Sequence, residues 1–175
     1  DKHFYALDLN TGQELWRFTA ARGIPSSPTF YDNTIYFGSD DGFLYALNVF
    51  TGEVQWKFAT AQVIASRPLV YDGVIYFGTD AVRSYDQIGK FYAVNLKDLQ
   101  PLWILKTDKG FTASPVVSEE GIYYGSRDGK FYALDLKSGD QIWSYTTDGE
   151  ILSTPIVVNN LVFLSSSDTY LYALE

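Results

Sequence analysis

Hydrophobic residues in this chain occur in short runs that are separated by turn residues. The runs at 35–37 and 74–77 are continuously apolar, and each is followed by a glycine, Gly38 or Gly78. Short apolar runs bounded by turn residues are typical of strands buried on both faces. The segments 15–18 and 54–58 instead alternate apolar and polar residues, which is typical of half-buried strands. Because no segment shows sustained helical periodicity, the chain is predicted to be all-β.

The same pattern recurs roughly every 40 residues. A Tyr-Ala-Leu or Tyr-Ala-Val anchor places its alanine at positions 6, 46, 93, 133 and 173. Tryptophans at 16, 56, 103 and 143 and prolines at 28, 68, 115 and 155 keep the same phase. A repeat of this length with four short strands is typical of propeller blades. The sequence therefore predicts a β-propeller of four-stranded antiparallel blades.

Glycine-containing pairs mark the tight turns between these strands. Asp-Gly pairs occur at 41–42 and 128–129, and Thr-Gly or Ser-Gly pairs at 11–12, 51–52 and 138–139. Glycine tolerates the positive φ that such turns need. The third repeat has Asp98 and Leu99 in place of Thr-Gly, followed by Pro101. Since leucine disfavours positive φ by about 1 kcal/mol or more, we expect that turn to have a different shape.

Residues 6–16 read Ala-x-Asp-x-x-Thr-Gly-x-x-x-Trp, and the second and fourth repeats keep this pattern with small changes. The pattern resembles the tryptophan-docking motif of the pyrroloquinoline-quinone (PQQ)-like repeat propellers. WD40 repeats need Asp after the tryptophan, whereas Arg, Lys, Ile and Ser follow it here. In the family that the chain resembles, each indole docks between adjacent blades over the small alanine. The resemblance assigns this structural role to Ala6, Asp8, Gly12, Trp16, Ala46, Gly52, Trp56, Ala93, Trp103, Ala133, Asp135, Gly139 and Trp143.

Residues 1–8 and 168–175 align on the same strand of the repeat. The segment 1–175 is therefore predicted to hold three complete blades with partial blades at both ends. Proteins that it resembles usually close eight blades, so we expect part of a larger ring, either as a fragment or as half of a two-chain ring. An open arc exposes aromatic faces and an unpaired strand. We therefore expect self-association that completes a propeller.

Composition narrows the function classes. The formal net charge of −8 and pI near 4.5 argue against nucleic-acid binding, which needs clustered Lys and Arg. No apolar run approaches the ~18 residues of a membrane helix, so no membrane insertion is expected. The absence of cysteine excludes disulfides and thiolate metal sites, and His3 as the only histidine excludes a histidine-based metal centre.

Two kinds of loop should lie on the same face of the propeller. One joins the fourth strand of a repeat to the first strand of the next repeat, and the other joins the second and third strands within a repeat. The second repeat is seven residues longer than the others, and the extra residues lie near 81–87. An insertion that occurs in one blade only commonly contributes to a propeller's specific binding surface. The candidate partner-binding face comprises Arg22, Arg67, Arg83, Tyr85, Lys109 and Arg127. Aspartates at 40, 41, 80, 86, 108 and 148 lie in the same loops. An ordinary mixed solvated surface is the alternative.

The resemblance implies a non-catalytic module without cofactor, acting as a protein-binding scaffold or sensor in the periplasm or outside a bacterial or archaeal cell. Similar proteins include a lipoprotein of the outer-membrane barrel-assembly machinery. One alternative is a PQQ- and Ca²⁺-dependent alcohol dehydrogenase, but the acidic residues fall mostly in turns, including Glu119 and Glu120 on the opposite face. A second alternative is glycan binding through Tyr85 and Tyr170.

Overall fold

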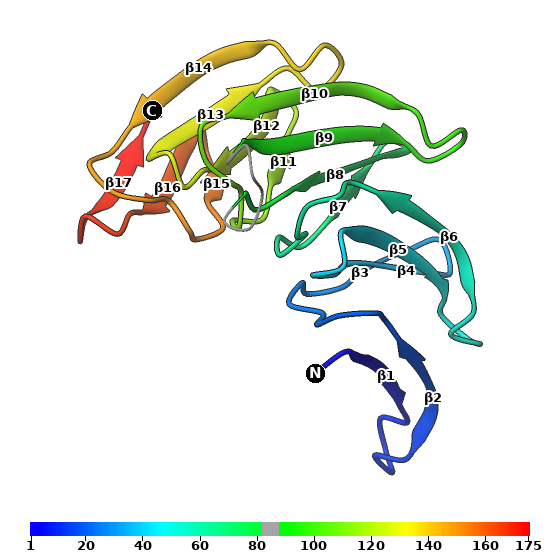
Figure 1. Cartoon of the computed structure of the whole chain (residues 1–175). Coiled ribbons are helices and arrows are strands. Elements are labelled where there is room, and N and C mark those ends of the chain that lie inside the picture. The colour runs from blue at the N-terminus through cyan, green and yellow to red at the C-terminus, as the bar shows by residue number, and fades with distance from the viewer. Residues whose placement is uncertain (82–87) are drawn as a thin grey trace.

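The computed structural model describes residues 1–81 and 88–175 as β-strands joined by turns (Figure 1). The first sheet pairs β1 (His3–Leu7) with β2 (Glu14–Thr19). The second contains β3 (Thr29–Tyr31), β4 (Thr34–Gly38), β5 (Phe43–Asn48) and β6 (Val54–Ala59). The third contains β7 (Leu69–Tyr71), β8 (Val74–Gly78), β9 (Gly89–Asn95) and β10 (Pro101–Thr107).

The fourth sheet contains β11 (Val116–Ser118), β12 (Gly121–Gly125), β13 (Lys130–Leu134) and β14 (Gln141–Thr146). The fifth has β15 (Ile156–Val158), β16 (Leu161–Ser165) and β17 (Leu171–Leu174). All strand pairs are antiparallel between chain neighbours. The sheets follow one another along an open arc, with β2, β6, β10 and β14 on its outer rim (Figure 1). The predicted all-β fold of four-stranded propeller blades is confirmed.

The inner strands lie on the concave side of the arc, where β3 contacts β7 and β11 contacts β15. Between them and the rim, aromatic and aliphatic side chains of neighbouring sheets pack face to face. Phe91 on β9 stacks on Tyr124 of β12 with ring centroids 3.9 Å apart, and Phe111 meets the same tyrosine edge-on. Burial of these faces holds the sheets together, because each sheet alone would expose both of its apolar surfaces.

Two of the indoles, those of Trp16 and Trp103, connect neighbouring sheets at the rim. Trp16 Nε1 donates to Val49 O at 3.0 Å, and Trp103 Nε1 donates to Leu136 O at 3.0 Å. A Cβ on Gly52 would lie 2.5 Å from the Trp16 ring, and a Cβ on Gly139 would lie equally close to Trp103. These two turns therefore need glycine both for positive φ and for the space that the indole occupies.

The turn of the third repeat corrects the sequence-based expectation. Leu99 adopts φ +57°, and its amide donates to Asn95 O at 2.9 Å. Gly52 makes the equivalent bond to Asn48 O at 2.9 Å with φ +72°. The turn thus keeps its shape because the β9–β10 pairing and the side chain of Asn95 fix it, and Leu99 bears the conformational cost.

Candidate binding face at the loops

One face of the arc is built by two sets of loops that are hydrogen-bonded to each other in register. In four successive sheets, one residue just after the second strand donates its backbone amide to a carbonyl of the loop that enters that sheet. The donors are Asp40, Asp80, Arg127 and Ser167, and the carbonyls are those of Gly23, Val63, Gly110 and Glu150, at 2.8–3.0 Å. Each sheet therefore holds the side chain at this position beside the loop that enters it. The side chain is acidic at Asp40 and Asp80 and basic at Arg127, so the third and fourth sheets carry opposite charges at equivalent positions.

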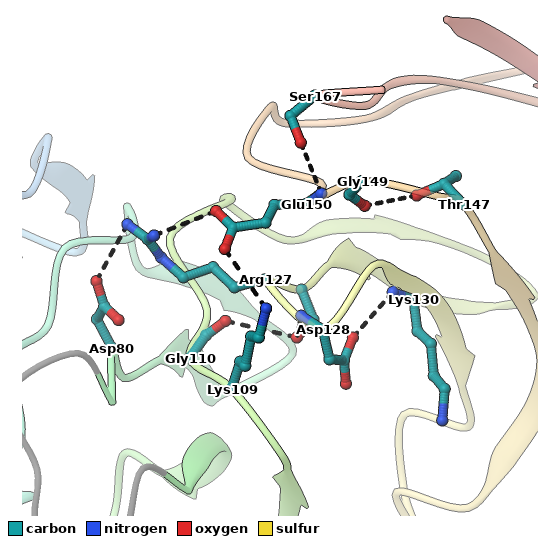
Figure 2. Close-up of polar contacts among 11 residues, drawn as sticks. Asp80, Lys109, Gly110, Arg127, Asp128, Lys130, Thr147, Gly149, Glu150 and Ser167 are labelled. Atoms are coloured by element: carbon teal, nitrogen blue, oxygen red, sulfur yellow. Dashed lines mark hydrogen bonds and ion pairs between the residues drawn. The ribbon is translucent and has the colours of Figure 1, made fainter. Parts of the chain in front are cut away.

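Arg127 is the centre of an ion-pair network that spans three sheets (Figure 2). Its Nη2 lies 3.5 Å from Asp80 Oδ2, and its Nη1 lies 3.3 Å from Glu150 Oε2. Lys109 Nζ lies 3.8 Å from the other oxygen of Glu150. The side chains of Arg127 and Asp80 are only 27% and 11% exposed. Solvent screening is therefore weaker here than for an ordinary surface pair, and the network ties adjacent blades together.

Two adjoining cavities lie beside this network. One, of about 310 Å³, is lined by Arg22, Asp40, Asp41, Gly42, Ala61, Gln62, Val63 and Asp80. The other, of about 290 Å³, is lined by Pro25, Asp40, Val63, Ala65, Asp80, Thr112 and Arg127. Thr112 Oγ1 and Arg127 Nε are buried and lack a hydrogen-bond partner among the described residues. The cavities thus combine charged walls with small apolar residues, a lining suited to polar side chains of a partner.

Several aspartates of this face serve internal contacts. Tyr45, Tyr132 and Tyr172 donate their hydroxyls to Asp41, Asp128 and Asp168 at 2.8–2.9 Å. Burial, followed by the hydrogen bond to the Asp41 carboxylate, raises the pKa of Tyr45 to about 12. These carboxylates also accept turn amides, those of Phe43, Lys130 and Tyr170. They therefore shape the loops of the face.

The structure places the sequence-predicted residues in three different settings. Arg22 lines the larger cavity, and Lys109 and Arg127 belong to the ion-pair network. Arg67 is absent from these linings and lies just before β7, where its Nε donates to Thr29 Oγ1 at 3.0 Å. Arg83 and Tyr85 fall outside the described residues.

The sequence prediction placed Asp80 in the same loops but did not pair it with Arg127, and it did not include Glu150. Asp80 and Arg127 occupy the same repeat position in successive sheets. Opposite charges at equivalent positions of neighbouring repeats could therefore have indicated this ion pair. Glu150 stands where other repeats have glycine or valine, which was a second signal.

Nothing in the described part of the chain fits a quinone-enzyme metal centre. Residues 1–81 and 88–175 contain no group of three His, Cys, Asp or Glu side chains able to hold a metal ion. No step through Ca²⁺ or a quinone is therefore derived. Nor does the same part of the chain contain a helix that could cross a membrane.

Comparisons with known proteins agree with this architecture. The family model described as outer membrane protein assembly factor BamB matches residues 1–110 and 89–175. BamB from Moraxella catarrhalis aligns with 22% identity and a TM-score of 0.77 over 93% of this chain and 50% of that one. The computationally designed Ika8 protein aligns with 18% identity and a TM-score of 0.81 over 97% of this chain and 51% of that one.

Quinohemoprotein alcohol dehydrogenase from Comamonas testosteroni aligns with 15% identity and a TM-score of 0.80, over 99% of this chain and 38% of that one. The chain thus spans about half the length of the first two structures, and the identities show a shared fold only. No curated protein sequence matches. Because the family model covers the whole chain, the protein belongs to the PQQ-like repeat β-propeller family of the outer membrane protein assembly factor BamB.

Proposed function

We propose that this protein is a non-catalytic binding scaffold whose loop face receives a protein partner. The observation that carries the proposal is the ion-pair network of Arg127, because it fixes side chains from three sheets into one charged surface. Membership of the BamB family supports a role in protein assembly. A rigid surface lowers the conformational entropy lost on binding, which favours a propeller as a docking platform.

The proposal is tested with two basic residues that are exposed on this face. Arg22→Glu combined with Lys109→Glu should weaken capture of the natural partner at least tenfold in quantitative cross-linking with extract of the source organism. Arg17→Glu combined with Lys57→Glu on the outer rim is the matched control, since it makes the same change in net charge away from the face. Equal capture by all three proteins would refute this surface as the binding site.

The catalytic alternative is addressed separately. We expect no dye-linked alcohol oxidation after incubation of the protein with PQQ and Ca²⁺, and no quinone absorbance retained after gel filtration. Turnover that depends on both additions would overturn the scaffold proposal in favour of a quinoprotein dehydrogenase, the class to which one structural neighbour belongs.

We also propose that the 175-residue chain self-associates through the faces of its first and fifth sheets. Leu171 on β17 is 74% exposed, whereas Leu44, Phe91 and Phe131 at the same repeat position are fully buried. The first sheet exposes the face that points away from the second sheet: Leu7 is 56% exposed, although Leu47 at its repeat position is fully buried. Each face lacks the neighbour that covers it elsewhere in the arc, and a second copy offers both complements.

Light scattering at micromolar concentration should therefore give a mass near twice the 19.7 kDa of the chain. Leu171→Glu should shift this mass to that of the monomer, whereas Leu102→Glu on the outer rim should not. A sharp monomer mass for the unmodified protein would contradict the proposal.

Family membership further leads us to propose that the protein works in the periplasm or outside the cell. Fractionation of the source cells with an antibody against the chain should recover it outside the cytoplasm. Recovery with a cytoplasmic marker enzyme would contradict this location.

A further inference from the structure

The four inner segments of the arc differ from the loop face in their charge. They comprise residues 25–31, 65–71, 112–118 and 152–158, and Arg67 is the only charged residue in all four. Its repeat equivalents are Ser27, Ser114 and Thr154. The inner wall is therefore a surface of hydroxyl and apolar side chains with a single cation, in a protein whose net charge is −8.

Neighbouring sheets hold Arg67 in place from both sides. Its amide donates to Ser114 Oγ of the next inner segment at 3.1 Å. Its Nε donates to Thr29 Oγ1 of the preceding inner segment at 3.0 Å, and Thr29 in turn donates to Pro68 O. Since Thr29 is buried, it gives the guanidinium a fixed support. The Nε donor of the guanidinium is thus occupied, and this hydrogen bond orients the group.

The two terminal nitrogens of Arg67 have no hydrogen-bond partner in the part of the chain that the structure describes. Within the described residues no carboxylate lies within ion-pair distance of this side chain, although it is exposed. Arg17 and Arg127 differ in this respect: Arg17 pairs with Glu14, and Arg127 pairs with two acids. An anchored guanidinium with two free terminal nitrogens matches the geometry of a bidentate oxyanion.

We propose that Arg67 forms a binding site for a small oxyanion, a carboxylate or a phosphate, on the inner wall of the propeller. The two terminal nitrogens donate to two oxygens of the anion, while the hydroxyl of Thr29 keeps the fork oriented. Among residues 1–81 and 88–175, no acid forms an ion pair that competes with the anion for the fork. The site is independent of the proposed scaffold function, since Arg67 lies outside the cavities of the loop face.

The test titrates the full chain with inorganic phosphate and, in a separate arm, with sodium acetate, both at constant ionic strength. Arginine Nε–Hε resonances are followed by NMR, and the Arg67 signal is identified by its loss in Arg67→Lys. We expect saturable shifts of this signal, and calorimetric binding that weakens at least tenfold in Arg67→Gln. Arg67→Lys should bind with intermediate strength, because it keeps the charge and loses the fork.

Arg17→Gln is the matched control, since it removes an arginine that is already paired at the outer rim. Circular dichroism of every variant establishes that the fold is retained. Saturation by either anion that is lost in Arg67→Gln supports the proposal, and the arm that saturates identifies the source as carboxylate or phosphate. Saturation by neither anion overturns it, as does binding that is equal in Arg67→Gln or equally weakened in Arg17→Gln.

Discussion

Replacing Tyr124 by phenylalanine should stabilise this protein. The side chain is fully buried between the third and fourth sheets, and its hydroxyl has no hydrogen-bond partner among the described residues. A hydroxyl buried without a partner costs about 1–3 kcal/mol in protein mutational data. Phe37 and Phe77 occupy the same repeat position and are fully buried, so a phenyl ring fits this environment.

The expected gain is smaller than the full desolvation cost, because removing the oxygen leaves a small void. A void of roughly 10 Å³ costs about 0.2 kcal/mol at 24 cal/mol per Å³. The stacking of the ring on Phe91, with centroids 3.9 Å apart, should remain. We therefore expect the free energy of unfolding to rise by about 1–2 kcal/mol, and the midpoint of thermal unfolding by roughly 2–8 °C for a chain of this size.

Urea and thermal unfolding followed by circular dichroism measure this change. Tyr132→Phe is the matched control: its hydroxyl donates to Asp128 at 2.8 Å, so its removal should destabilise by about 1 kcal/mol. Phe77→Tyr is the reverse change and should destabilise by about 1–3 kcal/mol. A Tyr124→Phe protein that is no more stable than the original would refute the reasoning, because it would mean that the hydroxyl is satisfied, for example by an enclosed water molecule.

Further perturbations test three other features: the turn at Leu99, the buried tyrosines and the ion-pair network. Leu99→Gly should raise the free energy of unfolding by about 1 kcal/mol, because glycine adopts φ +57° without steric cost. Gly52→Ala should lower it by more than about 1 kcal/mol, because the new Cβ would meet the Trp16 ring at positive φ. A loss of stability in Leu99→Gly would contradict the argument from φ. Burial raises the pKa of Tyr45 and Tyr76 to about 12, so the stability that they contribute is complete below about pH 10 and is lost as pH rises through about 12. Absorbance at alkaline pH should then show tyrosines that ionise well above pH 10, and titration of every tyrosine near pH 10 in the folded state would contradict this. Glu150→Gln removes the shared acid of two basic side chains and should cost under about 1 kcal/mol in urea unfolding at low salt, with the difference shrinking as salt is added; a salt-independent cost would point to packing instead.

The strands, their order and most of the turns could be predicted from the sequence, because these features depend on residues that are close in the chain. Gly52 and Gly139 illustrate this: the turn and the packed indole both follow from a recognisable local motif. Leu99 shows the limit of such reasoning, since its intrinsic preference argued for another turn, yet the surrounding β9–β10 pairing imposed the same one.

The candidate site was less predictable. Basic residues could be assigned to one face from alternation of the loops, but the sequence alone did not show that Arg127 is neutralised by Asp80 and Glu150, which lie 47 and 23 residues away. The same holds for Arg67: the sequence grouped it with that face but did not show its hydrogen bond to Thr29. Long side chains can reach in several directions, and only their neighbours select one.

By itself, the sequence determined a chain of four-stranded units, since hydrophobic alternation and turn chemistry act within a single repeat. Only the tertiary structure decided which charges meet and that Arg67 stands between Thr29 and Ser114. It alone also showed that the Tyr124 hydroxyl has no hydrogen-bond partner within residues 1–81 and 88–175. The physical reason is that such contacts join residues about one repeat apart, where the stacking angle and spacing of neighbouring sheets, rather than local conformation, set the distances.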